Sequence, residues 1–328
     1  MVSDFRTVRP RSVEEVAEAL REPGSFFITG NGGLKETFSL PTAYSDARQL
    51  QSLRQLEEQG WTVSAAARSV IRRSEGSDGA WTRLDTRGLD GIVEHDPADQ
   101  VVVVRAGTLI ASLQQELAAK GQCLPLPDVK EFGQPLAGFP GTIGGTLSMN
   151  LPHGLASQCG SWREWVLGMT VVRPNGSIAK AGSKAVKNVA GYDVQKLLIG
   201  ARGTLAVVAE VILRTFPLKA LPRPSFRMVR PWKQESLWIQ RTLPAQFSSA
   251  VEAAGDSLLS ADEASSTLWA AVPAEQELTR SPEDWVIRSG AGSRNLQIPL
   301  GPEAELMLRG KGLFDPDAKL NPGAMGIF

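Results

Sequence analysis

Two glycine-rich stretches, far apart in the sequence, limit what this chain can fold into more than any other feature. The first is TGNGGLK at residues 29–35, and the second is GFPGTIGGTLSMN at residues 138–150. Because glycine lacks a Cβ, the backbone can turn tightly there and several N–H groups can converge on one anion. Neither stretch matches the Rossmann pattern GxGxxG or the P-loop pattern GxxxxGK[ST]. Each could be an ordinary tight turn, whereas the two together indicate a cradle for a pyrophosphate.

Short segments around these stretches predict alternating helices and strands. Residues 12–24 predict a helix that a capping box opens at Ser12 and Glu15 and that a Pro-Gly pair ends. Its apolar face is made of Val13, Val16, Ala17 and Leu20. The apolar residues 26–28 then predict a buried strand that runs into the first glycine stretch.

A second strand and helix are expected further along. Four valines at residues 101–104 predict a buried strand, and a helix is expected from Thr108 to Gly121. One side of this helix is made of Leu109, Leu113 and Leu117. The order of strand and helix is that of an α+β or α/β unit.

The middle of the chain predicts a multi-stranded sheet. Two apolar runs within residues 166–179 flank PNGS at residues 174–177, which is typical of a hairpin. A third run, at residues 204–216, is rich in Val, Ile and Leu. Prolines at positions 217, 222 and 224 then mark a domain boundary.

Composition narrows the functional class. The 328 residues include 35 Lys and Arg against 35 Asp and Glu, so the overall charge favours no nucleic acid or acidic membrane surface. We find neither a secretory signal nor an apolar run long enough to span a bilayer, and two cysteines are too few for a disulfide framework. We therefore expect a cytoplasmic protein that reaches the inner face of a membrane only through a partner.

Four further segments carry a specific resemblance. They are VKNVAGYDVQKLLIGARGTLAVVAEVILRTFP (residues 186–217), LDGIVEHDPADQVVVVRAGT (89–108), GQCLPLP (121–127) and FDPDAKLNPG (314–323). Together they resemble the FAD-binding subunit of bacterial glycolate oxidase, within the vanillyl-alcohol-oxidase superfamily with its PCMH-type FAD-binding domain.

The resemblance implies an α+β fold and non-covalent FAD. It implies a PCMH-type FAD-binding domain at residues 1–217, with subdomains at about 1–88 and 89–217. A small α+β cap is expected at residues 218–300, and residues 301–328 are expected to return to the FAD domain.

The resemblance also implies which residues contact FAD. The first pyrophosphate loop would be Gly30, Asn31, Gly32, Gly33, Leu34 and Lys35. The second contact would be Gly141, Thr142, Ile143, Gly144 and Gly145, with Ser148 and Asn150 as polar contacts in the same run. Gly203, Thr204, Val207 and Val208 would give a backbone edge along the flavin or adenine, and Pro127, Asp128 and Val129 would approach the isoalloxazine. A bulkier residue at Gly144 would then disturb cofactor binding and leave the fold intact.

The sequence departs from the family at two points. Leu34 takes the position of a threonine in the first loop, which removes a hydroxyl contact to phosphate, and Ala206 replaces a glycine. Related 2-hydroxy-acid dehydrogenases carry a metal-binding histidine pair in the cap, whereas residues 217–328 contain no histidine. We therefore expect no metal site in this chain.

Few residues are candidates for catalysis. His95 is expected at the surface, and His153 follows the second glycine stretch closely enough to approach the cofactor. Arg163, Lys187, Tyr192 and Arg294 have suitable side chains, and Tyr192 and Asp193 lie inside the KNVAGYD motif. Both cysteines, Cys123 and Cys159, are expected to be buried thiols.

Three functions remain open. The leading hypothesis is the FAD-binding subunit of a glycolate-oxidase-like complex, with a second FAD-binding subunit and an iron–sulfur subunit as partners and a small 2-hydroxy acid as substrate. The second is a self-sufficient FAD-dependent dehydrogenase or oxidase of another alcohol or hydroxy acid. The third is a non-catalytic scaffold with a weakened FAD site.

Overall fold

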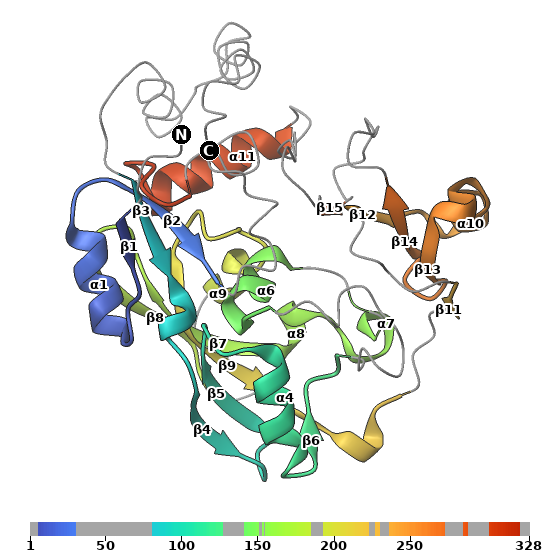
Figure 1. Cartoon of the computed structure of the whole chain (residues 1–328), viewed down its shortest axis with the longest axis horizontal. Helices are drawn as coiled ribbons and strands as arrows, with labels where there is room; N and C mark the ends of the chain where they lie inside the picture. The colour runs from blue at the N-terminus through green and yellow to red at the C-terminus, as the bar shows by residue number, and fades with distance from the viewer. Residues whose placement is uncertain are drawn as a thin grey trace, which may run out of the picture.

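The described part of the chain folds into helices and sheets of the α+β class, as the sequence predicts. The computed structural model describes residues 6–30, 81–126, 141–150, 153, 155–184, 193–222, 227–229, 236–272, 285–287 and 302–321. Two sheets pack together at one side of the molecule, and a third lies apart from them with its own helix (Figure 1).

The first sheet is parallel and has the order β1-β3-β2, formed by Arg6–Val8, Trp81–Asp85 and Ser25–Thr29. Helix α1 (Val13–Arg21) connects β1 to β2 and begins as predicted, since the Ser12 side chain accepts from the Glu15 N–H. The predicted apolar face is confirmed for Val16, Ala17 and Leu20, which are buried. Because all three strands are parallel, their carboxyl ends meet at one edge, next to Gly30.

The second sheet has the order β4-β5-β9-β7-β8 and is antiparallel. Its strands are Ile92–Asp96, Val101–Arg105, Val207–Arg214, Val166–Val172 and Ile178–Gly182. The predicted hairpin is confirmed, because β7 pairs with β8 and Gly176 turns with φ +78°. The last strand, β9, inserts between β5 and β7, so strands distant in sequence become neighbours.

Short helices and a small ribbon cover the second sheet. They are α4 (Ile110–Ala118), α6 (Ile143–Met149), α7 (Ala156–Cys159), α8 (Trp162–Trp165) and α9 (Val194–Leu198), with β6 (Gln122–Cys123) paired to β10 (Phe216–Pro217). The predicted apolar side of α4 is wrong at Leu109, which precedes the helix and is 36% exposed. Thr108 does not open α4 either, because its hydroxyl accepts from the Gly91 N–H.

Two hydrophobic cores lie on opposite faces of the second sheet. One includes Leu113 and Leu117 of α4, Trp162 and Trp165. The other joins the two sheets, since Val16 and Leu20 of α1 pack with Phe26 of β2 and with residues of β7 and β9. The first sheet is therefore held against the second through α1 and β2.

The third sheet lies within the segment predicted as a cap. Its order is β11-β13-β14-β12-β15, formed by Arg227–Met228, Leu258–Asp262, Thr267–Val272, Ser236–Arg241 and Trp285–Ile287. Helix α10 (Phe247–Ala254) packs on it through Ala250, Val251 and Ala254. The domain boundaries expected near residues 88, 217 and 300 stay a prediction.

The C-terminal segment lies against the first sheet. Helix α11 (Pro302–Phe314) lies beside the starts of β2 and β3 (Figure 1), and Leu320 forms a parallel bridge with Phe26. The Lys311 ammonium is 1% exposed and bonds to the Asp315 carboxylate at 2.6 Å and to the Thr204 and Leu320 carbonyls at 2.6 and 2.8 Å. A buried charge of this kind is tolerated only with several partners.

Among the helices in the described ranges, none has the length and apolar character needed to cross a membrane.

We predict that Lys311→Met lowers the free energy of unfolding by about 3–5 kcal/mol, because the fully buried Asp315 carboxylate loses its cation. Urea unfolding followed by tryptophan fluorescence measures the change. The matched control is Lys184→Met, which breaks the exposed pair with Glu94 and is expected to cost less than about 1 kcal/mol. Equal losses in the two variants would contradict the prediction.

Candidate functional site

The carboxyl ends of the parallel strands lie beside the start of the first glycine stretch. Strand β2 ends at Thr29, strand β3 ends at Asp85, and these two residues are partners in the ladder. Gly30 follows Thr29 directly. In open sheets of parallel strands, ligands bind outside the carboxyl ends of the strands, so this edge is a candidate ligand-binding site.

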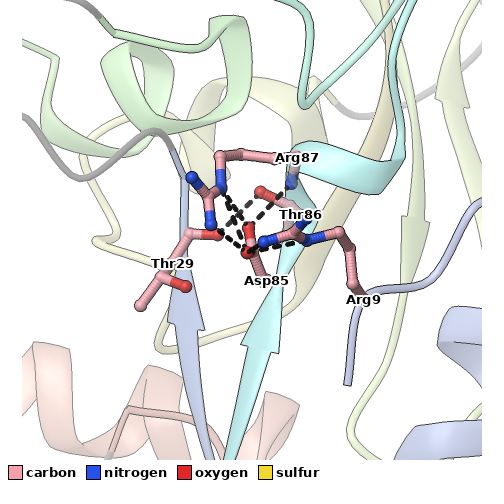
Figure 2. Close-up of polar contacts among 5 residues, drawn as sticks. All are labelled: Arg9, Thr29, Asp85, Thr86 and Arg87. Atoms are coloured by element: carbon pink, nitrogen blue, oxygen red, sulfur yellow. Dashed lines mark hydrogen bonds and ion pairs between the residues drawn. The ribbon is translucent and has the colours of Figure 1, made fainter. Parts of the chain in front are cut away.

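A buried carboxylate at this edge holds two guanidinium groups (Figure 2). Asp85 is 1% exposed and accepts from Arg9 Nε and Nη2 at 3.0 and 2.8 Å and from Arg87 Nε at 2.8 Å. Thr86 Oγ1 donates to the Thr29 carbonyl at 3.0 Å, which joins the two strand ends. In Figure 2 the Arg87 guanidinium reaches across to the end of β2, above Thr29.

Among the described residues, this cluster contains two guanidinium groups for one carboxylate, an excess of one positive charge. Burial alone would raise the pKa of Asp85, but the hydrogen bonds from Arg87 and Arg9 outweigh it and lower the pKa below its ordinary value. Asp85 is therefore ionised near neutral pH and balances one of the two guanidinium groups. Since Arg9 and Arg87 stay partly exposed, the edge of the sheet is electropositive and favours an anionic ligand.

The two glycine stretches meet at Gly30 and Thr142. A Cβ built on Gly30 would lie 2.5 Å from Thr142 Oγ1, so only glycine fits this contact. Thr142 is 1% exposed and is the N-cap of α6, where its Oγ1 accepts from the Gly145 N–H at 3.2 Å. A hydroxyl that accepts one bond can still donate its own hydrogen. The backbone therefore brings both stretches to one point.

The amides of the second stretch are mostly occupied within the protein. The N–H groups of Ile143 and Gly144 donate to the Thr108 and Ala106 carbonyls at 2.9 and 2.7 Å, and Gly145 donates to Thr142. Gly141 accepts from Ile110 through its carbonyl at 3.1 Å. Two amides expected to face a pyrophosphate, those of Ile143 and Gly144, therefore hold α6 against the turn after β5 instead, and the amide of Gly145 closes the N-cap of α6.

Gly144 serves the fold, which corrects the expectation that a bulkier residue there would spare it. A Cβ at Gly144 would lie 2.9 Å from the Ala106 Cβ and 3.1 Å from the Ala106 carbonyl oxygen. By contrast, a Cβ at Gly145 would meet only Thr142 Oγ1, at 3.1 Å. The physical reason is close packing between α6 and the backbone that follows β5.

The far end of α6 contacts the turn at residues 200–204. Asn150 ends α6 in the left-handed conformation, with φ +47°. The Gly200 N–H donates to the Leu147 carbonyl at 3.0 Å, and the Arg202 N–H donates to the Ser148 carbonyl at 2.9 Å. Ser148 and Asn150 therefore lie in the same region as Gly203 and Thr204.

The residues expected to lie along the flavin or adenine ring of FAD are largely buried in the protein. The Thr204 hydroxyl donates to the Ala201 carbonyl at 2.6 Å, and the Thr204 backbone carbonyl accepts from the Lys311 ammonium. The side chains of Val207 and Val208 lie in the two different cores, so only their backbone could contact a ligand. Gly203, with φ +68°, is in a conformation that favours glycine.

Several predicted residues lie outside the described part of the chain. They are Asn31, Gly32, Gly33, Leu34, Lys35, Pro127, Asp128, Val129, Lys187, Tyr192 and Arg294. Asp193 is described and is paired with Lys196 at 2.7 Å near the surface. The hydrogen bond from Lys196 lowers the pKa of Asp193, which makes this carboxylate a poor proton acceptor at neutral pH.

The two histidines have different surroundings. His95, expected at the surface, is half-buried in the edge strand β4 and lies 2.7 Å from Gln122 Oε1. His153 is buried against Trp165, with ring centroids 4.7 Å apart, and within the described ranges neither of its nitrogens has a hydrogen-bond partner. Burial lowers the pKa of His153 to about 4 although Gly160 and Glu164 oppose the shift. His153 is therefore neutral at pH 7.

The two cysteines and Arg163 have structural surroundings. Burial raises the pKa of the Cys123 thiol to about 11, which confirms an unreactive buried thiol, whereas Cys159 is only half-buried. Arg163 is exposed and donates to the Ile199 carbonyl at 3.4 Å. Within the described ranges, no group of three or more His, Cys, Asp or Glu side chains could hold a metal ion.

Sequence reasoning missed Arg9, Asp85 and Arg87. An acidic residue at a strand end with Arg two positions later, as in LDTRG at residues 84–88, is a signal that could have indicated them. The pairing of Arg9 with Asp85 has no local signal, because 76 residues separate them.

Comparison with known proteins adds evidence on the cofactor. Residues 51–182 match the family model described as an FAD binding domain. The chain is 35% identical over 141 residues to glycolate oxidase subunit GlcE of Escherichia coli (strain K12), a match that covers 43% of this chain and 37% of that protein.

Two further relatives are similar over a comparable stretch. Glycolate oxidase subunit GlcD of Bacillus subtilis (strain 168) is 33% identical over 39% of this chain and 26% of its own length. D-lactate dehydrogenase of Anaerostipes hadrus is 29% identical over 52% of this chain and 33% of its own length. The matches thus span about a third of these relatives.

A solved structure of alkyldihydroxyacetonephosphate synthase has a TM-score of 0.44 and 15% sequence identity to this chain. The structural match covers 75% of this chain and 36% of the synthase chain.

We predict that Gly144→Ala destabilises the protein by about 1–3 kcal/mol, because its Cβ overpacks against Ala106. Gly145→Ala is the matched control, one residue away in the same helix. It is expected to leave the free energy of unfolding unchanged or to raise it slightly through helix propensity. Thermal unfolding followed by circular dichroism compares the two, and a Gly145→Ala variant that is the less stable would contradict the packing argument.

We predict that His153 makes stability fall in mild acid. The unfolded histidine binds a proton below its ordinary pKa of 6.5, whereas the folded one does so only near 4. Stability from this residue is therefore present above pH 6.5 and is lost as the pH falls, by about 3 kcal/mol at pH 4. His153→Phe should remove this part of the pH dependence, as urea unfolding at several pH values would measure. An unchanged pH profile would contradict it.

Proposed function

We propose a function from the premise that this chain contains an FAD binding domain and is related to glycolate oxidase subunits. We propose that the chain is an FAD-linked oxidoreductase that binds FAD non-covalently as a subunit of an enzyme that oxidises a small 2-hydroxy acid. The observation that supports this best is the contact of Gly30 with Thr142, where the two glycine stretches meet.

Several residues are suited to hold the diphosphate of FAD. Residues 30–35 would bind it with backbone amides, and the Thr142 hydroxyl would donate to it from the N-cap of α6. The excess positive charge of Arg9 and Arg87 would favour it electrostatically from the edge of the first sheet. Gly203 would approach the cofactor with its backbone only.

FAD, when bound, supplies a hydride acceptor for the oxidation of an alcohol carbon. This chain would orient the cofactor and exclude water from it, through the buried segments on either side of α6. The relatives named as glycolate oxidase subunits, D-lactate dehydrogenase and D-2-hydroxyglutarate dehydrogenase share a 2-hydroxy acid in their names, which supports this substrate class.

We further propose that catalysis depends on partner subunits. Asp193 is a poor base because of its lowered pKa, and the His153 side chain is buried against Trp165. The sequence has two cysteines, too few for the four thiolates of an iron–sulfur cluster. Electrons would therefore pass to a second FAD-binding subunit and an iron–sulfur subunit. Such partners would also account for any peripheral association with a membrane.

We include the division into domains in this proposal. The FAD domain would end near residue 217, the third sheet would belong to a cap at residues 218–300, and residues 301–328 would return to the FAD domain. The bonds of Lys311 and Asn321 to the first part of the chain support the last of these assignments.

A specific observation favours a second candidate, a scaffold subunit with a weakened FAD site. The amides of Ile143, Gly144 and Gly145 donate within the protein, so the second stretch offers fewer donors to a diphosphate than expected. Leu34 also lacks the hydroxyl that the resemblance would provide.

We predict that the purified chain is yellow and releases its flavin into the supernatant on acid precipitation, as non-covalent FAD would. The visible spectrum before and after precipitation checks this. A colourless protein that no added FAD turns yellow would favour the scaffold.

The same preparation tests the dependence on partners. Alone, the chain should not reduce a dye with glycolate or D-lactate, whereas the complex isolated from its native host should contain another flavoprotein and an iron–sulfur protein and should reduce it. Dye reduction by the isolated chain would instead favour a self-sufficient dehydrogenase.

A further inference from the structure

The segment after α11 extends the first sheet at its β2 edge. The Phe26 N–H donates to the Lys319 carbonyl at 2.7 Å, and the Asn321 N–H donates to the Phe26 carbonyl at 2.9 Å. The Asn321 side chain then continues this pairing, since its Oδ1 accepts from the Ile28 N–H at 2.8 Å. Asn321 therefore binds β2 two residues before Gly30.

The other side of the same amide binds the turn at residues 200–204. Asn321 Nδ2 donates to the Arg202 carbonyl at 2.8 Å. It also lies so close to Gly203 that a Cβ there would approach it to 2.7 Å. Because one side chain uses its acceptor on β2 and its donor on the turn, it fixes the separation of these two segments.

These bonds close a circuit of contacts, which we call the contact ring. From Gly30 at the end of β2 the ring passes to Thr142 and along α6. The turn at residues 200–204 binds the end of α6, and Asn321 joins that turn back to β2. Asn321 lies opposite the Gly30–Thr142 contact in this ring.

Buried charges hold the Asn321 segment in one conformation. The Asp315 carboxylate accepts from the Lys319 and Leu320 N–H groups at 2.9 and 2.7 Å, and Lys311 joins it to the Thr204 and Leu320 carbonyls. Asn321 has φ +39° and is 4% exposed. Charges buried in this way contribute little net stability for their cost, which favours a role in fixing geometry.

We propose that Asn321 is a positioning residue for the cofactor, because it sets the separation of the two segments, β2 with Gly30 and the turn with Gly203, that would contact different parts of FAD. This inference rests on the proposed FAD site. The residue does not touch the reacting atoms and acts through β2 and the turn at residues 200–204.

Two substitutions test the two side-chain hydrogen bonds of Asn321, one by removing a single bond and the other by removing both. Asn321→Asp keeps the acceptor for Ile28 but loses the donor to Arg202, and it places a carboxylate against that carbonyl. Asn321→Gly removes both bonds, and glycine accepts the positive φ without strain. Ser12→Ala is the matched control, since it removes the N-cap of α1 without touching the contact ring.

The test is titration of each full-length apoprotein with FAD, followed by quenching of flavin fluorescence. Asn321→Asp and Asn321→Gly should weaken FAD binding by about tenfold or more, and Ser12→Ala should change it less than about twofold. Melting temperatures with and without saturating FAD give a second readout. FAD should raise the melting temperature less in the Asn321 variants than in the wild type.

Each remaining outcome has a defined meaning. Asn321 variants that bind FAD as tightly as the wild type would overturn the inference, and so would equal losses of melting temperature in the apo and FAD-bound forms. Failure of both Asn321 variants to fold would also overturn it, because the residue would then serve the fold alone. A wild-type protein that binds no FAD would instead refute the proposed function.

Discussion

The geometry of the candidate site depends on a contact in which no side chain can be added. Gly30 at the end of β2 lies against Thr142, the N-cap of α6, and a Cβ at Gly30 would overlap the threonine hydroxyl. Around this point the first sheet, the turn after β5 and α6 pack through backbone atoms, as Gly144 does against Ala106. Glycine here is a packing requirement as much as a conformational one, because any larger residue would separate the layers.

Two buried carboxylates and their cationic partners determine the charge around the site. Asp85 is ionised inside the protein because two guanidinium groups surround it, and the second of them leaves the strand ends electropositive (Figure 2). At the other side of the contact ring, Lys311 and Asp315 form a neutral buried pair with backbone partners. The first arrangement favours an anion, whereas the second orders a segment. The two clusters therefore differ in role because the first has two cations for one carboxylate and the second has one cation for one carboxylate.

The second glycine stretch lies where the sequence predicts, but its backbone amides have another role than the predicted one. It lies beside the first stretch, as a shared cradle requires, yet the amides of Ile143, Gly144 and Gly145 bond within the protein. The hydroxyl of Thr142 and the first stretch are then the groups suited to a diphosphate. Fewer donors from α6 give added weight to the residues that position the segments around it, such as Asn321, which joins β2 to the turn at residues 200–204.

The sequence by itself determined the local elements. The capping box of α1, the valine strand β5, the hairpin of β7 and β8 and the α+β class follow from contacts among near neighbours, which periodicity and turn chemistry report. The motifs also indicated FAD, which the family match to residues 51–182 supports. Only the tertiary structure decided the insertion of β9 between β5 and β7, the pairing of Arg9 with Asp85 and the bond from Ile28 to Asn321, 293 residues apart. Such contacts depend on how whole elements pack, and no spacing along the chain encodes them.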